Sequence, residues 1–452
     1  MNKSSVIGKI LITGDLVLKS PLLIGDGAGE TSGNFRDVHV LKNLQGEPFI
    51  PGTSLCGVLR EWFEGISPAW TAKIFGDGEE MQSSIQLEDI VLTDGDIIPR
   101  DGVHIDGVTG AGVDGGKYDF EVVERGAKGK IRLLITLRGI HVDKNADDKN
   151  YSLDEVRDVI AIFLRRLLDG IRLGALTTKG FGLVAVENLN AGLFDFRDKI
   201  DVATWLLGKS ATKKILPSDE KFSTNQSDFV VDAFFKFNSS FIIRDYEVSA
   251  ADKEKNISSA TLKSRKDFVI PGTSLKGILR HRAEYICGKL GIAKEILNDL
   301  MGNSTADEKI KSRFIVAESY LEPANFIEVN HTRTKIDRLT GGTLQGTLFT
   351  TKAAYQKNHG APVLKIHFEI HKAKIFEAGL AIFLLRDFWL GHVAIGGEKS
   401  IGRGTLSGLS AEIKFNGKTY KLGTNGKILE GDKSEFENFA AALKDFSGGD
   451  GK

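Results

Sequence analysis

The stretch Ile50-Pro51-Gly52-Thr53-Ser54-Leu55-Cys56-Gly57-Val58-Leu59-Arg60 returns 220 positions later as Ile270-Pro271-Gly272-Thr273-Ser274-Leu275-Lys276-Gly277-Ile278-Leu279-Arg280. When both copies are extended to Glu64 and Glu284, ten of the fifteen paired positions are identical. Chance does not give that agreement at one place in a chain of 452 residues. The sequence therefore predicts a duplication whose two copies fold alike.

Each copy is predicted to form a sharp turn that leads into a helix. Pro and Gly end a short apolar strand, and the Thr-Ser pair that follows offers the hydroxyls that commonly cap helix N-termini. The first turn of such a helix exposes backbone N–H groups that suit a phosphate. Arg60 or Arg280 stands within two turns of this end. A well-capped structural helix would explain a single copy equally well, but the same small residues in both copies favour an anion site.

Charge and composition limit the class of protein. The chain has 60 basic and 60 acidic residues, so a protein that coats nucleic acid without specificity, which would be strongly basic, is disfavoured. Six Lys or Arg residues nevertheless fall between positions 261 and 285, against two acids. This local excess fits either a defined nucleic-acid groove or a solvated charged face.

The redox and membrane signals point to one compartment. Cys56 and Cys287 lie far apart and show no metal-binding spacing, which suits a reducing environment. No apolar run is long enough to span a bilayer, and the N-terminus lacks the apolar segment of a signal peptide. We therefore expect a cytoplasmic protein with no membrane partner.

The repeat extends well beyond the quoted helix. Each copy has an opening strand (10–18 and 229–237), a later strand (130–137 and 363–370), an amphipathic helix (153–169 and 376–390), a Gly-rich turn (178–182 and 400–404) and a closing strand. This order predicts an α+β protein with two tandem ferredoxin-like or RRM-like βαββαβ domains, each carrying a long mid-domain insertion. The expected boundaries are 1–192, a linker at 193–228, 229–415, and a C-terminal extension at 416–452 whose end is disordered.

Three motifs together resemble the RAMP (repeat-associated mysterious protein) superfamily, and within it the backbone subunits of type III CRISPR effector complexes. They are the Ile-Pro-Gly-Thr-Ser-Leu-x-Gly-x-Leu-Arg segment, Ile-Asp-x-x-Thr-Gly in mid-unit (Ile105 and Ile336), and the late Gly-x-Gly turn. Two units in one chain look like the fused double backbone subunit of the type III-D branch. The resemblance implies as partners a guide crRNA, its paired single-stranded target RNA, and other type III subunits in a filament-like complex.

The resemblance also implies a palm that holds the RNA backbone without reading its sequence, and the matching positions have suitable chemistry. Gly lets the backbone approach RNA closely, whereas Lys and Arg supply positive charge. The expected RNA-binding residues are Ser54, Arg60, Thr178, Lys179, Gly180, Gly182, Ser274, Lys276, Arg280, Arg282, Ser400, Gly402, Arg403 and Gly404.

The resemblance further implies that the mid-unit insertion forms a thumb, which wedges into the guide–target duplex and displaces a base pair. Apolar residues at its tip would act as the wedge, and neighbouring polar residues would contact RNA. The expected thumb residues are His104, Ile105, Val108, His331, Arg333, Ile336, Arg338 and Leu339.

The resemblance implies cleavage of the target RNA at the kinks, by an aspartate and a divalent metal that is expected to be Mg²⁺. Asp37 matches the family's catalytic position and is the best candidate ligand, because a carboxylate near the scissile phosphate can hold a metal. In the second copy Ser258 stands opposite Asp37, so Asp245 or Asp252 would have to substitute there. Asp26 pairs with Asp245 between the copies and is a weaker candidate.

Two other readings remain open at this point. The chain could be an RNA-binding backbone without catalysis. It could also be a metal-independent endoribonuclease that processes guide RNA, with His331 as general acid or base, although a histidine beside a basic thumb is more often an RNA contact.

Overall fold

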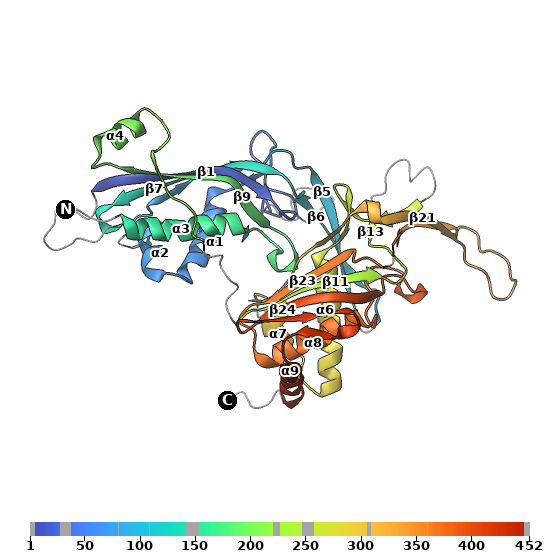
Figure 1. The fold of residues 1–452 in the computed structure, drawn as a ribbon. Coiled ribbons are helices and arrows are strands. Elements are labelled where there is room, and N and C mark those ends of the chain that lie inside the picture. The colour runs from blue at the N-terminus through green and yellow to red at the C-terminus, as the bar shows by residue number, and fades with distance from the viewer. Residues whose placement is uncertain are drawn as a thin grey trace. The chain divides into compact units, whose positions relative to one another are not determined.

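The computed structural model describes residues 5–27, 38–79, 81–107, 109–141, 153–219, 227–245, 257–304, 309–358 and 360–446. The chain divides into two compact units. The first comprises Met1–Arg100, Tyr118–Thr177 and Phe181–Ser223, and the second comprises Asp101–Lys117, Thr178–Gly180 and Thr224–Lys452. Each unit is built on one antiparallel sheet with helices packed on it (Figure 1).

The central strand of the first unit is β1 (Val6–Leu18). It pairs with β9 (Leu183–Asp195) on one side and with β7 (Lys128–Arg138) on the other, and β3 (Ile85–Leu87) adds to β7. Counted along the chain, the last strand therefore lies beside the first, followed by the third and the second. That order is the ferredoxin-like one.

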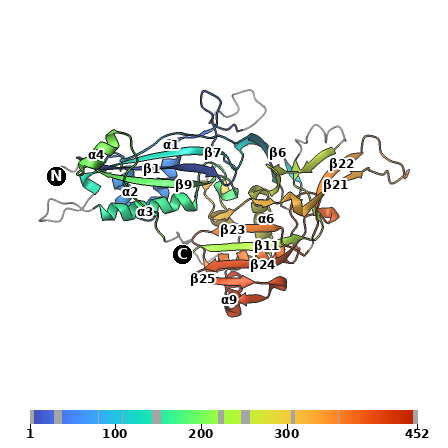
Figure 2. The same cartoon turned by 45° about the horizontal axis from the view of Figure 1, so that its top comes forward.

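The second unit repeats this arrangement. Its central strand β11 (Phe229–Phe237) pairs with β24 (Leu406–Phe415) and β23 (Leu364–Ile370), and β19 (Phe314–Val316) adds to β23. Beyond β24 the sheet continues into β25 (Lys418–Leu422), as Figure 2 shows. The predicted α+β class, with two ferredoxin-like repeats, is confirmed.

Alternation along the strands explains why each sheet has one packed face. In β11 every second residue, from Phe229 to Phe237, is fully buried, and the residues between them are only partly covered. Helices α6 (Gly272–Leu290) and α8 (Ile375–Trp389) supply the other half of this core. In the first unit α1 (Gly52–Glu64) and α3 (Asp154–Asp169) do the same.

The mid-unit insertions form β-hairpins. In the first copy β5 (Ile97–Ile105) pairs with β6 (Gly112–Val123). In the second copy β21 (Phe326–Arg333) pairs with β22 (Phe349–Gln356). The insertions therefore have the hairpin geometry that a projecting element requires.

Shorter elements complete both units. Those in the first copy and after it are β2 (Phe49–Ile50), α2 (Pro68–Phe75), β4 (Ile90–Val91), β8 (Ile171–Arg172), α4 (Lys199–Leu206) and β10 (Lys213–Lys214). Those in the second copy are β12 (Ser240–Phe241), β13 (Arg244–Asp245), β14 (Ile257–Thr261), β15 (Lys263–Ser264), β16 (Asp267–Ile270), α7 (Ile296–Met301), β17 (Asn303–Ser304), β18 (Lys309–Ile310), β20 (Ser319–Leu321), β26 (Ile428–Glu430) and α9 (Lys433–Asp445). Within the described ranges, none of the helices is both long and apolar enough to cross a membrane.

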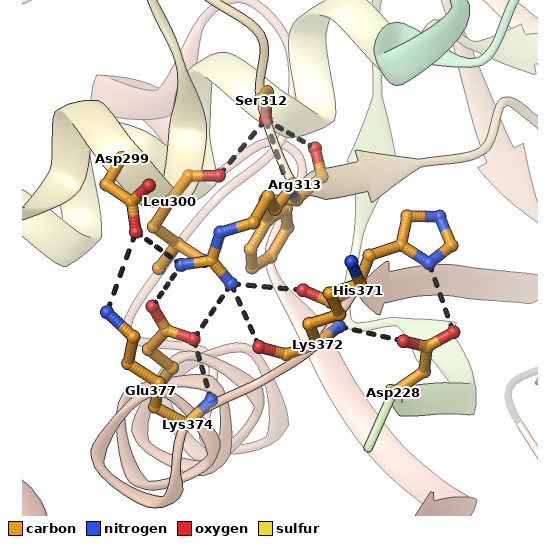
Figure 3. Close-up of polar contacts among 10 residues, drawn as sticks. Asp228, Asp299, Leu300, Ser312, Arg313, His371, Lys372, Lys374 and Glu377 are labelled. Atoms are coloured by element: carbon orange, nitrogen blue, oxygen red, sulfur yellow. Dashed lines mark hydrogen bonds and ion pairs between the residues drawn. The ribbon is translucent and has the colours of Figure 1, made fainter. Parts of the chain in front are cut away.

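A polar network ties the base of the second sheet to its helices (Figure 3). Arg313 donates to Glu377 at the start of α8 at 2.5 and 3.2 Å, and to Asp299 of α7 at 2.6 Å. Asp228, just before β11, accepts from the Lys372 N–H at 2.8 Å and contacts His371 Nδ1 at 3.1 Å. Glu377 is almost fully buried, so its charge is compensated where it lies.

Candidate functional site

The two Gly-rich turns are held by the same main-chain hydrogen bonds. In the first unit the Gly182 N–H donates to Pro21 O at 2.8 Å, Leu173 to Gly182 O at 2.9 Å, and Ala175 to Leu23 O at 2.7 Å. In the second unit Gly404, Ile395 and Gly397 donate to Ser240 O, Gly404 O and Ile242 O at 2.8, 2.9 and 2.8 Å. The two repeats therefore agree down to individual hydrogen bonds. In this alignment, residues 173–182 correspond to residues 395–404.

Glycine is required at the end of each turn. A Cβ on Gly182 would lie 1.9 Å from the carbonyl oxygen of Leu173, and one on Gly404 would lie 1.9 Å from that of Ile395. Both residues also have a φ (+75° and +73°) that side chains disfavour. Gly182 and Gly404, which the sequence predicts as RNA contacts, are buried, and they are required because the chain passes close to itself at these positions.

The side chains under the two turns differ, although their backbones agree. Leu176 and Glu398 are equivalent and both are left-handed, with φ of +56° and +57°. In the first unit Phe181 is buried with Leu23, Phe120 and Val122, and Leu176 packs against this cluster. The equivalent of Phe181 in the second unit is Arg403.

In the second unit, ion pairs made by Glu398 occupy the place that the apolar cluster has in the first unit. Its Oε2 accepts from Arg333 Nη2 and from Arg403 Nε, both at 2.7 Å, and its Oε1 lies 3.6 Å from Arg244. Burial alone would raise the pKa of Glu398, but the hydrogen bonds from Arg333 and Arg403 outweigh it and hold the pKa below its ordinary value. Glu398 therefore links the Gly-rich turn to strand β21 of the hairpin insertion.

Arg403 is not the exposed cation that the sequence suggested. It is 3% exposed, and besides Glu398 it donates to Ser240 Oγ. Ser400 and Gly402, by contrast, are exposed at the tip of the turn. A Cβ on Gly402 would meet nothing within 4 Å, so this part of the turn is open to a ligand.

The Ile-Asp-x-x-Thr-Gly motif forms the same closed turn at both hairpin tips. Asp106 Oδ1 accepts from the Thr109 N–H at 2.6 Å, and Asp337 Oδ1 accepts from the Thr340 N–H at 2.9 Å. The N–H of Gly110 and that of Gly341 donate to the main-chain oxygens of these aspartates, at 2.9 Å each. The Asp and Thr of the motif are therefore turn-forming residues.

The residues expected as wedges are on the surface. Leu339 is 97% exposed, Ile336 59% and Ile105 44%, and His104 and Arg338 are exposed as well. Val108 lies outside the described residues. His331 stacks on Tyr355 of β22, and its Nε2 is 3.0 Å from the Tyr355 hydroxyl. Burial, then Arg403 and Arg333, lower the pKa of His331.

The helix N-termini differ from the expectation. Pro51 and Pro271 are the N-caps, and no side chain caps either helix, so the expectation of Thr-Ser caps is wrong. Ser54 and Ser274 lie inside the first turn. The Gly52 N–H, expected to be open to phosphate, donates to Asp89 Oδ1 at 2.8 Å. A carboxylate of the chain therefore already uses the first free donor of α1.

The expected cations of the two copies are used differently. Arg280 donates to Gly302 O at 2.8 Å and to Asn298 at 3.3 Å, and Arg282 donates to Asp387 at 2.6 Å. Arg60 is exposed, lines a shallow pocket with Gly76 and Ser83, and has no hydrogen bond or ion pair among the described residues. Of the two equivalent arginines, Arg60 is the one available to a ligand.

Lys276 points inward rather than to solvent. It is 6% exposed, and its Nζ donates to Ser312 Oγ at 2.7 Å and to Phe314 O at 2.8 Å. Residues Thr178–Gly180 belong to the same compact unit, where Thr178 Oγ1 accepts from Lys276 at 3.0 Å. Burial, helped by Lys179 and Arg280, lowers the pKa of Lys276 to about 7. Burial also lowers the pKa of Lys179.

Two of the candidate catalytic residues, Asp37 and Asp252, lie outside the described residues. Asp26 is exposed, and its N–H donates to His39 O at 3.1 Å, which places it beside the segment that follows Asp37. Asp245 pairs with Ala260 in the ladder between β13 and β14, and Ser258 donates to Thr350 O at 2.9 Å. No cluster of three or more His, Cys, Asp or Glu suited to a metal occurs among the residues that the structure describes.

Sequence reasoning missed Glu398 and Asp89. The signal for Glu398 was its pairing with Leu176, because a charged residue opposite an apolar one within an aligned turn marks a change of chemistry. Asp89 carried no such signal, because it lies 37 residues from Gly52, whose N–H donates to it.

Comparison with known proteins agrees with the duplication. No curated protein matches the sequence. One solved structure with a similar chain is described as a cryo-EM structure of the type III-B Cmr-beta bound to cognate target RNA. The match has 15% sequence identity and a TM-score of 0.31, and it covers 41% of this chain and 61% of the other. The model of the RAMP superfamily matches residues 15–185 and 234–407. These two ranges make up most of the protein and coincide with its two repeats, so the chain belongs to the RAMP superfamily.

Proposed function

We propose that this chain is a two-repeat backbone subunit of a type III CRISPR ribonucleoprotein, which binds a guide RNA and the target RNA paired to it. The observation that carries the proposal is the pair of identically bonded Gly-rich turns, one in each sequence repeat, together with a hairpin insertion in each repeat that exposes apolar residues near its tip. Such a pair suits a periodic ligand, and an RNA backbone is periodic. Other type III subunits are its partners in this proposal.

The accessible groups suit contacts that position RNA without reading its sequence. The exposed tip of the second turn offers the Ser400 hydroxyl beside the open space at Gly402, and Arg60 offers a guanidinium with no acceptor in the described part of the chain. Contacts of this type fix the register of a nucleic acid, and the sequence would be read by the guide through base pairing.

We further propose that the chain cleaves the target RNA with a divalent metal, Mg²⁺, near Asp37. A carboxylate-bound metal would supply charge stabilisation at the scissile phosphate. Among described residues, Asp26 lies beside the segment that follows Asp37 and adds a carboxylate of the kind that Mg²⁺ prefers. Ser258, at the equivalent position of the second repeat, is engaged with Thr350. We therefore expect the first repeat to cut and the second to bind, unless Asp245 or Asp252 supplies the missing acid.

The test uses the assembled complex with an end-labelled target RNA. Asp37→Ala is expected to remove one set of cleavage products and to leave guide and target affinity unchanged, and chelation of the metal should give the same loss. Asp26→Ala, Asp245→Ala and Asp252→Ala, together with Ser258→Ala as matched control, locate any further cut. If every product persists in Asp37→Ala, the catalytic proposal fails and the non-catalytic backbone remains. If the purified wild-type complex contains no RNA, the whole function fails.

A further inference from the structure

The ion pairs of Glu398 orient arginine side chains in the second repeat, and the first repeat has no charged residue at the equivalent position. At the same backbone position the first repeat has Leu176, packed in an apolar cluster. An apolar cluster can only hold the turn in place. A carboxylate that binds guanidinium groups can also fix the direction in which those groups point.

Two of the arginines at Glu398 differ in how many of their N–H donors remain available to a ligand. Arg403 is buried, and its guanidinium is shared between Glu398 and Ser240. The Arg333 side chain is 29% exposed and bonds Glu398 through Nη2. Its other N–H groups have no acceptor among the described residues. Arg333 is therefore a guanidinium that is fixed at one edge and open at the other.

The position of Arg333 suits a ligand that passes along the thumb. It is the last residue of β21 and pairs with Phe349, so it lies where the hairpin continues toward its exposed tip. His331, two residues earlier, is on the same face of the strand and is stacked on Tyr355. A planar guanidinium with free N–H groups binds phosphate in a fork, and prior fixing reduces the entropy lost on binding.

We propose that Glu398 is a positioning residue, which aims Arg333 at a phosphodiester group of the bound RNA. The inference deepens the proposed function and rests on it. It predicts a difference between the repeats, since the first has no charged residue at the position of Glu398. In this proposal, the RNA contacts of the second repeat include one between Arg333 and a phosphate, and this contact depends on the ion pair between Arg333 and Glu398.

The experiment measures affinity of the full-length chain for a labelled single-stranded RNA over a series of salt concentrations. Arg333→Gln is expected to weaken binding about tenfold or more and to lower the slope of log affinity against log salt by about 0.7, the value for one lost phosphate contact on a single strand. Glu398→Gln should produce a similar change, and adding it to Arg333→Gln should cost nothing further. This lack of additivity is the mark of one residue acting through another.

Two further variants separate positioning from a purely structural role. Glu398→Gln leaves Arg403 buried without its carboxylate and can lower stability, so the double variant Glu398→Leu/Arg403→Phe copies the apolar pair of the first repeat. It should fold, as circular dichroism and thermal unfolding will check, and show the same reduced salt slope. Leu176→Ala, the matched control in the first repeat, should leave the slope as in the wild type.

The outcomes are distinct. If the wild type binds no RNA, the proposed function fails and the inference fails with it. If the wild type binds RNA but Arg333→Gln leaves the slope unchanged, or if Glu398→Gln weakens binding equally in both backgrounds, the inference alone is overturned.

Discussion

Glu398 and Leu176 occupy the same left-handed backbone position in the two repeats, with φ of +57° and +56°. The main chain around both positions makes matching hydrogen bonds at 2.7 to 2.9 Å. The duplication therefore kept the main-chain frame of the turn while the chemistry beneath it changed from apolar packing to ion pairs. An exchange of this kind is often nearly neutral for stability when the whole cluster changes together, whereas removal of one charged partner is costly.

The closing glycine of each turn should be intolerant of any side chain. Gly404→Ala would place a Cβ 1.9 Å from the Ile395 carbonyl oxygen at a φ of +73°, so we expect a loss of about 3 kcal/mol or more in the free energy of unfolding. Gly402→Ala is the matched control, because it has a similar φ of +83° but open space, and should cost only about 1 kcal/mol. Urea unfolding measures both. Equal losses would show that the close carbonyl is unimportant.

The Arg313–Glu377 pair should be a main stabiliser of the second unit. Glu377 is 2% exposed and bonded twice by Arg313, so Glu377→Ala leaves the guanidinium without its buried partner and should cost about 3–5 kcal/mol. Asp299→Ala removes an exposed partner of the same arginine and should cost less than about 1 kcal/mol. Chemical denaturation of the two variants checks this. A loss at Asp299 as large as that at Glu377 would contradict the ranking.

Lys276 should make stability depend on pH in the alkaline range. Its pKa is about 7 in the folded chain and about 10.4 when unfolded, so between these values the unfolded state binds more protons. The free energy of unfolding should therefore rise with pH from about 7 to about 10.4 through this group, and stay constant below about 7, where both states are protonated. Lys276→Met should flatten that rise.

The comparison for Lys276 uses urea unfolding of the wild type and the variant at several pH values in that window. Lys335→Met, which removes a charge from an exposed site in the second hairpin insertion, serves as the control. A pH dependence of equal steepness in Lys276→Met and the wild type would show that Lys276 is not the source.

The thumb tip should matter for function and not for folding. Leu339 is 97% exposed, so Leu339→Ser should change the free energy of unfolding by less than about 0.5 kcal/mol. Under the proposed function it should nevertheless reduce distortion of the guide–target duplex, which a fluorescent base analogue beside the thumb would report. Leu429→Ser, at a 65% exposed site outside the thumb, is the control. An unchanged fluorescence signal in Leu339→Ser would remove the wedge role.

The fold could be predicted from the sequence because its signals are local and doubled. The Pro-Gly turn, the alternating strand 229–237 and the amphipathic helices each follow from spacing alone, and each was seen twice. The strand order then follows from the βαββαβ sequence of elements. The elements β25 and α9 carried no repeat signal, and were predicted only as an extension.

The sequence could not predict whether an individual Lys or Arg side chain points to solvent or into the protein. Arg280 and Arg60 are equivalent residues of the repeated motif, yet Arg280 donates to Gly302 O whereas Arg60 has no partner in the described residues. The inward direction of Lys276 depends on acceptors at Ser312 and Phe314, which are distant in sequence. Side-chain charge indicates that a partner is needed, but only the tertiary fold determines whether that partner is a ligand or the protein itself.

The Gly-rich turns have a practical consequence for protein engineering. Because matching main-chain hydrogen bonds hold both turns, residues 173–182 and 395–404 can be treated as cassettes of the same backbone geometry. A chain carrying two copies of either cassette, with the packing partners of that cassette exchanged as well, would allow the contribution of one cassette chemistry to be measured twice.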